Sequence, residues 1–169
     1  MKRQWEKLEA WLGANNPALL ADLNPPASDG DIQTLEQKIG VKLPADFVEC
    51  LKVHDGQRGK AEWLFDGNEF LSIRNILMSW SVWTDLLGDG DFDGRVSKPD
   101  GGIQSEWWMK GWIPFATNGG GDYLCLDLNP SESGCVGQVI RVFHDFPKRA
   151  LVSASFSEWI EGFVENKLA

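Results

Sequence analysis

The stretch that most constrains the fold of this chain runs from Trp112 to Asp127 and reads as a strand, a tight turn and a second strand. Its first part is apolar, and Pro114 favours an edge or early strand position because proline cannot donate to a β-ladder. Residues 118–121, Asn-Gly-Gly-Gly, tolerate the positive φ angles that a tight turn requires. Over residues 123–128 leucine then occupies every second position, which predicts a strand with one apolar face.

Apolar spacing and capping residues predict helices before and after this hairpin. Ser28 is a good N-cap and Gly40 a good C-terminal stop for a helix between them, and Ser155 with Glu158 forms a capping box for the last helix. The helical period predicts helices over 3–12, 28–39, 44–54, 73–87 and 155–163. Further short strands are expected over 61–66, 69–72, 136–144 and 150–153.

This order of elements predicts an α+β fold. Helices come first, strands lie in the middle and a helix closes the chain, without the regular alternation of a doubly wound fold. We expect one domain over residues 1–169, with a largely antiparallel central sheet packed by N-terminal helices and one C-terminal helix. Apolar residues make up 43% of the chain and include nine tryptophans, ample for a core. The polar, glycine-rich residues 88–105 are expected to form a surface loop.

Three segments together resemble a known family. In the first, Leu43-Pro44 lies between two helices and Asp55-Gly56 ends the second helix. The hairpin follows, and then a strand that begins at 137–139 and a closing helix over 155–163. This order is similar to that of the SUKH superfamily, which includes fungal regulators of cell-wall glucan synthesis and bacterial toxin-immunity proteins. The resemblance is strongest over residues 28–165, and residues 73–111 match none of its motifs.

The resemblance implies a non-catalytic protein-binding domain. Its main implication is a bacterial immunity protein that binds and neutralises a toxin domain, often a basic nuclease. The alternative is a regulatory scaffold, as in fungal members, although those carry long disordered extensions that this sequence does not contain. A net charge of −9 disfavours nucleic-acid binding and would speed the encounter with a basic protein partner. The same charge is also compatible with solubility alone.

The sequence offers no set of residues for catalysis and no cofactor motif. It has no nucleophile elbow and no metalloprotease helix, and Cys125 lies between leucines, where an inert buried thiol is the commoner case. The three cysteines match no disulfide or metal spacing, and no apolar run is long enough to cross a bilayer. We therefore expect a cytoplasmic protein that is not an enzyme, binds no membrane and carries no cofactor.

One acidic motif approaches a calcium loop. Asp89, Asp91 and Asp93 precede Gly94 in the pattern D-x-D-x-D-G, and Asp100 falls on the last ligand position. Against this reading, the last ligand is aspartate rather than glutamate, and glycines follow where an exit helix should begin. Calcium binding through residues 89–100 remains an alternative function, and a solvated surface loop without metal is favoured.

Trp112, Asp122 and Asp127 are the candidate binding residues. Tryptophan is a common anchor at protein interfaces. The two carboxylates could contact a partner, or they could stabilise the turn through local bonds to the backbone, which is the reading we favour. The sequence does not decide which tryptophans are exposed, and it leaves the oligomeric state open.

Overall fold

The computed structural model describes residues 1–169 and contains six helices and six strands. The helices are α1 (Lys2–Asn15), α2 (Pro17–Asp22), α3 (Asp29–Ile39), α4 (Ala45–Leu51), α5 (Ile73–Gly88) and α6 (Phe156–Leu168). The strands are β1 (Glu69–Phe70), β2 (Lys98–Pro99), β3 (Trp112–Thr117), β4 (Tyr123–Asp127), β5 (Gln138–Val142) and β6 (Lys148–Ser153). No helix is both long and apolar enough to span a membrane.

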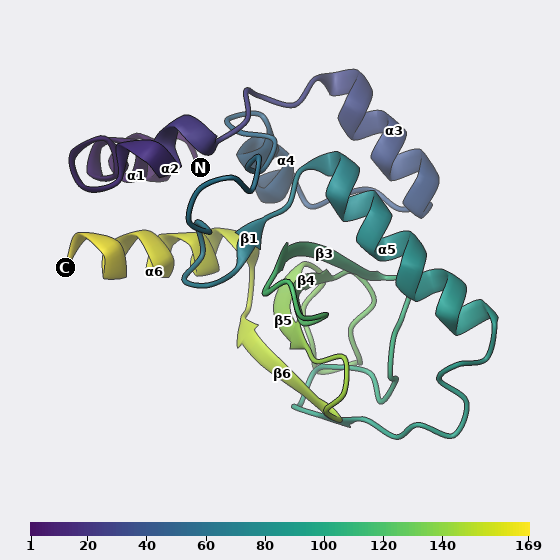
Figure 1. The fold of residues 1–169 in the computed structure, drawn as a ribbon. Coiled ribbons are helices and arrows are strands. Elements are labelled where there is room, and N and C mark those ends of the chain that lie inside the picture. Colours follow the sequence, from purple (N-terminus) through teal and green to yellow (C-terminus); the bar gives the residue numbers. More distant parts are fainter.

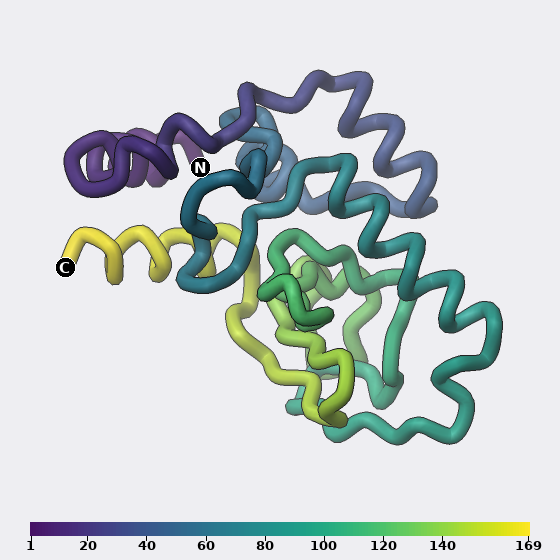
Figure 2. The backbone as a smooth tube through the Cα atoms, in the orientation of Figure 1, coloured from purple at the N-terminus to yellow at the C-terminus, as the bar shows by residue number.

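The strands form one sheet in the order β1-β3-β4-β5-β6-β2. All neighbouring pairs are antiparallel except β2 with β6, which is parallel. Helices α1, α2 and α6 lie together at one end of the molecule, and α5 runs along the sheet (Figure 1). The α+β prediction is therefore confirmed. The tube in Figure 2 makes plain that α1 and α6, from opposite ends of the sequence, lie beside each other.

The hairpin predicted from the sequence is present as β3 and β4. The two strands pair from Trp112 opposite Asp127 to Thr117 opposite Tyr123. Pro114 predicts an edge or early position, and β3 as a whole lies between β1 and β4. β1 pairs only with residues 116–117, so Pro114 faces no strand on its outer side, and a bulge follows it directly.

Both faces of the sheet are covered. On one face, Phe47 from α4, Phe115 from β3 and Phe156 from α6 meet with ring centroids 5.0–5.9 Å apart. A smaller cluster on the opposite face contains Trp83 of α5 and Cys125 of β4. The predicted alternation of β4 is confirmed, since Leu124 and Leu126 belong to the large cluster and Cys125 to the small one.

Two connecting segments differ from the prediction. Residues 61–66 form no strand, although the expected turn follows, where Phe65 and Asn68 exchange backbone hydrogen bonds of 3.0 and 3.2 Å. The expected loop over 88–105 carries the short strand β2 and buries Ser97 and Ile103. Its pairing with β6 extends the sheet by one strand, which local sequence patterns do not reveal.

Most helix ends lie where their caps predict. Ser28 Oγ accepts a hydrogen bond from the backbone N–H of Asp31 at 3.0 Å, and Gly40 ends the helix with φ of 75°. Helix α4 stops at Leu51 rather than at His54. The His54 ring instead contacts Asn24 O at 2.6 Å and a Glu9 carboxylate oxygen at 2.8 Å, which fastens this turn to α1 and the segment after α2.

Candidate functional site

The structure places the three predicted binding residues in two environments. Trp112 and Asp127 are fully buried at paired positions of the hairpin, whereas Asp122 lies at its partly exposed turn. The Trp112 ring packs edge-on against Trp108 at 6.1 Å in the smaller core cluster. Of these three residues, only Asp122 is exposed enough to contact a partner.

Asp127 holds two neighbouring segments of the chain together. Its carboxylate accepts hydrogen bonds from Gln138 Nε2 at 2.8 Å and from the backbone N–H of Asn129 at 3.0 Å. Gln138 Nε2 also donates to the Gly102 carbonyl at 2.9 Å, which ties the segment after β2 to β5. Burial raises the pKa of Asp127, and the donors offset only part of that increase. These contacts give Asp127 a structural role.

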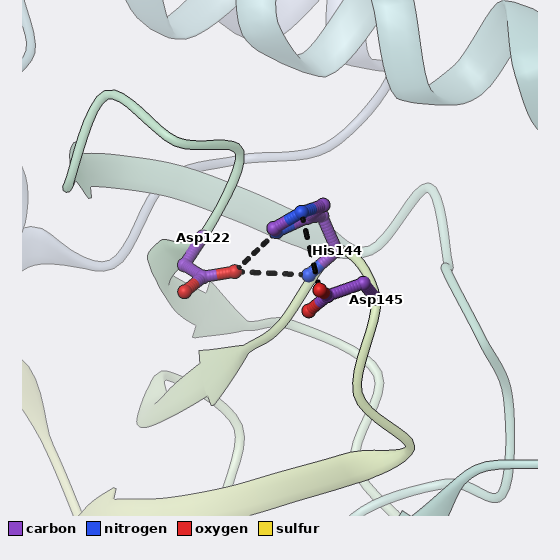
Figure 3. A group of neighbouring side chains, drawn as sticks. All are labelled: Asp122, His144 and Asp145. Carbon is purple, nitrogen blue, oxygen red and sulfur yellow. Dashed lines mark hydrogen bonds and ion pairs between the residues drawn. The ribbon is translucent and has the colours of Figure 1, made fainter.

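Asp122 forms a clamp with His144, as Figure 3 shows. Asp122 Oδ1 accepts from the His144 backbone N–H at 3.0 Å and from His144 Nδ1 at 2.8 Å. Asp122 Oδ2 accepts from Asn118 Nδ2 at 3.0 Å within the glycine turn. On the other side, His144 Nε2 lies 3.6 Å from an Asp145 carboxylate oxygen. The clamp joins the β3–β4 turn to the β5–β6 connection.

Electrostatics favour the charged form of both members of this clamp. The Asp122 hydrogen bond raises the pKa of His144, and nearby Asp145 adds to that increase. Burial alone would raise the pKa of Asp122, but the bonds from His144 and Asn118 outweigh it and the pKa lies below its usual value. The His144 imidazole therefore sits between two carboxylates that favour its protonated form.

Asp122, His144 and Asp145 are the one group of three potential metal ligands whose ligand atoms all lie within 4.8 Å of one another. Their internal hydrogen bonds already engage both Asp122 oxygens and His144 Nδ1. This arrangement is that of a hydrogen-bonded clamp rather than an open coordination site.

The acidic motif at 89–100 does not close into a calcium loop. Asp89, Asp91, Asp93 and Asp100 form no such group. Asp100 is ion-paired with Lys148 and accepts from the backbone N–H of Leu151 at 2.9 Å, so it fastens β2 to β6. The expected last ligand of the loop is therefore engaged at the edge of the sheet.

Cys125 is not placed for nucleophilic chemistry. The side chain is fully buried, and burial raises the pKa of its thiol well above the usual value, with Asp127 adding to that increase. A thiol in this state carries almost no thiolate at neutral pH.

A groove of about 390 Å³ lies between α1, residues 61–67 and α6. Four leucines form its apolar floor: Leu8, Leu12, Leu19 and Leu64. Three half-buried aromatic side chains line it: Trp11, Trp63 and Phe163. Asn16, Glu62, Asp66 and Lys167 add polar groups. We name this feature the α1–α6 groove.

The sequence did not reveal this groove. Phe163 lies on the apolar face of α6, yet it is only half-buried and lines the groove beside α1. The high tryptophan content was the one available signal, and it did not identify which rings are exposed.

The α1–α6 groove and the β3–β4 turn at residues 118–121 meet at the Trp63 side chain. Gly119 has φ of 73°, and a Cβ atom there would lie 2.7 Å from the indole of Trp63. A larger residue at this position would collide with the ring as well as strain the backbone. The turn that carries Asp122 therefore packs directly against a side chain that lines the groove.

The comparison with known proteins decides the family. The sequence profile described as "SMI1 / KNR4 family (SUKH-1)" matches residues 26–162. The chain belongs to the SMI1/KNR4 family. This confirms the resemblance to the SUKH superfamily that the sequence motifs indicated.

Curated relatives of this SMI1/KNR4-family chain include two yeast regulators. The chain is 27% identical over 174 residues to the "Cell wall biosynthesis/cell cycle regulator smi1" of Schizosaccharomyces pombe, covering 95% of this chain and 34% of that protein. It is 21% identical over 198 residues to the "Cell wall assembly regulator SMI1" of Saccharomyces cerevisiae, covering 96% and 39%. Human "F-box only protein 3" is 21% identical over 179 residues, covering 98% and 34%. The chain thus spans little more than a third of these relatives.

Proposed function

We propose that this chain is a non-catalytic protein-binding domain with a regulatory role, and that the α1–α6 groove receives its partner. The groove carries the proposal, because it combines an apolar floor with half-exposed aromatic side chains. Such rings are typical anchors at protein interfaces, and a concave apolar surface is a common docking site. The groove lining offers apolar, aromatic and charged side chains for binding and contains no cysteine, serine or histidine that could serve as a nucleophile.

The names of the relatives favour regulation over toxin immunity. The yeast relatives are named for regulation of cell-wall assembly and biosynthesis. A Neurospora crassa relative, 23% identical over 198 residues, is named "Glucan synthesis regulatory protein". None of these names refers to a toxin, so we carry forward the regulatory alternative rather than the immunity function. The proposed partner is therefore a protein that this chain binds in order to regulate it.

The test compares proteins retained by the wild-type chain and by two variants. Trp63→Ala removes one wall of the groove, whereas Phe146→Ala removes an aromatic ring that is 58% exposed and is not among the groove-lining residues. We expect a partner that the wild type and Phe146→Ala retain and Trp63→Ala loses. Circular dichroism of each variant checks that the fold is kept. An identical set of retained proteins for all three chains would exclude the groove as the docking site.

A further inference from the structure

The α1–α6 groove already holds a cation from its own chain. Lys167, in the last turn of α6, places its ammonium 5.8 Å from the Trp11 ring centroid and 5.5 Å from that of Phe163. The same ammonium is ion-paired with Asp66. Aromatic faces and a carboxylate together form a favourable environment for a cationic side chain.

The carboxylate in this arrangement belongs to a tight turn. Asp66 is the one residue other than glycine with a positive φ, at 47°, and Gly67 continues the turn with φ of 81°. The Asn68 side chain closes this turn, because its amide donates a hydrogen bond to the Phe65 carbonyl at 3.0 Å. Asp66 therefore lies at the rim of the groove with 65% of its side chain exposed.

A side chain from a partner could displace Lys167 from its ion pair with Asp66 and from its cation–π contacts. The Lys167 side chain is 27% exposed, and its contacts are a solvent-accessible ion pair and two long-range cation–π contacts. Each interaction of this type contributes little to the free energy of folding, because water and salt screen it. A side chain from a partner would make the same contacts and add apolar burial on the leucine floor.

We infer that the α1–α6 groove docks a lysine or arginine of a partner protein segment, flanked by apolar residues, and that Lys167 occupies this position until the partner displaces it. This inference rests on the proposed function and names the chemistry of its partner. Glu62 adds a second carboxylate to the groove lining, and the net charge of −9 favours a cationic partner over an acidic one. Lys167 thus acts as an internal competitor for the site.

The test uses a short amphipathic peptide made of leucine and lysine as the probe. Binding is measured by calorimetry, and its place by the indole N–H signals of Trp11 and Trp63 in NMR spectra. Lys167→Met removes the competing charge but keeps an unbranched apolar chain, and we expect it to bind the peptide roughly three- to tenfold more tightly. Asp66→Asn removes the carboxylate, and we expect weaker binding by about the same factor.

The chain provides a matched control. Lys148 and Asp100 form the same kind of ion pair at the β2–β6 edge, away from the groove lining. Lys148→Met and Asp100→Asn should leave peptide affinity unchanged. Equal affinity of Lys167→Met and wild type would overturn the inference, as would a change of the same size in Lys148→Met.

A second peptide separates this inference from the proposed function. The probe with glutamate in place of lysine should not bind. If it binds the groove equally well, the preference for a cation is refuted while the groove remains a protein-docking site. Light scattering measures the oligomeric state and so tests whether a second copy of the chain occupies the groove. A dimer that Trp63→Ala dissociates would replace the inferred partner with that copy, and the inference would fail.

Discussion

At the scale of single residues, His144 makes the chain's stability depend on pH. The hydrogen bond that His144 donates to Asp122 raises the pKa of His144 above its usual value, so the folded state favours the protonated ring. This contribution is fully present below the unfolded-state pKa of about 6.5 and is lost as the pH rises through the higher folded-state value. We expect the free energy of unfolding to fall as the pH rises above about 6.5, and His144→Gln to abolish that fall.

An NMR titration of the His144 ring measures this effect directly. Asp122→Asn should lower the pKa of His144 toward the usual value, because it removes the negative charge that Nδ1 contacts at 2.8 Å. A wild-type His144 pKa at or below the model-peptide value would contradict the assignment of the clamp.

Arg149 is the second residue-scale determinant of stability. Its side chain is fully buried, and burial lowers its pKa to about 10, so it stays charged at neutral pH. The guanidinium donates to the Trp107 carbonyl at 2.6 and 3.2 Å and to the Phe146 carbonyl at 2.8 Å, and it lies 4.6 Å from the Trp107 ring centroid. Arg149→Met would leave these carbonyls without a donor and should destabilise the fold by about 2–4 kcal/mol.

Urea unfolding measures this loss, and Arg141 on the neighbouring strand provides the control. Arg141 lies opposite Ala150 and is only half-buried. We expect Arg141→Met to change stability by no more than about 0.5 kcal/mol. Arg149→Lys keeps the charge but lacks the planar fork, so it should fall between wild type and Arg149→Met. Equal stabilities of the two methionine variants would show that the Arg149 contacts contribute nothing net.

At the scale of elements, Gly56 allows the chain after α4 to pack closely against the backbone at the start of α5. Its φ is 67°, and a Cβ there would lie 2.3 Å from the backbone nitrogen of Ser72. Gly40 has φ of 75° with no atom within 4 Å of such a Cβ. Gly40→Ala should therefore cost about 1 kcal/mol, from backbone strain alone. Gly56→Ala adds a backbone collision and should cost about 3 kcal/mol or more.

Thermal and urea unfolding of the two variants separate strain from collision. Asp55 makes the Gly56 site more sensitive, because its carboxylate accepts from the Ile73 backbone N–H at 2.7 Å at the start of α5. A displaced Gly56 would move this contact as well. Similar losses for Gly56→Ala and Gly40→Ala would mean that the chain relieves the collision without distorting the junction.

The elements that could be predicted from the sequence are those with local signals. Ser28, Gly40 and Ser155 cap helices through bonds to residues at most four positions away, so their roles are readable along the chain. Strand β2 has no such signal, because its two residues pair with Lys148 and Arg149 far along the sequence. The α1–α6 groove depends likewise on two helices from opposite ends of the chain.

At the scale of the whole molecule, the two-sided sheet explains why the site residues were only partly predictable. Alternation correctly assigned Asp127 to the face of β4 opposite the leucines. Periodicity could not show that this second face is also covered, because the cover comes from α5 and the irregular segment between β2 and β3. Trp112 and Asp127 are buried for that reason, while Asp122 stays at the surface because it lies in the turn beyond the strands.

The packed core also extends beyond the segment that the family profile matches. That match begins at residue 26, yet α1 contributes Trp5, Leu8 and Leu12 to the large core, each only 1% exposed. Trp5 stacks on Phe70 at 6.0 Å and packs edge-on against His54 at 4.9 Å. Removing residues 1–25 would expose this face of the core, so we expect the shortened chain to lose cooperative unfolding.

The variant Trp5→Ala tests the same packing without shortening the chain. Truncating a fully buried tryptophan should destabilise the fold by about 3–5 kcal/mol, measured by urea unfolding. Val136→Ala, at a position 73% exposed, should change stability by less than about 0.5 kcal/mol. If the chain from residue 26 onward unfolds as cooperatively as the whole, then α1 is an accessory to a smaller domain. The α1–α6 groove would then be a junction between that domain and an added helix, which would assign partner binding to the added part.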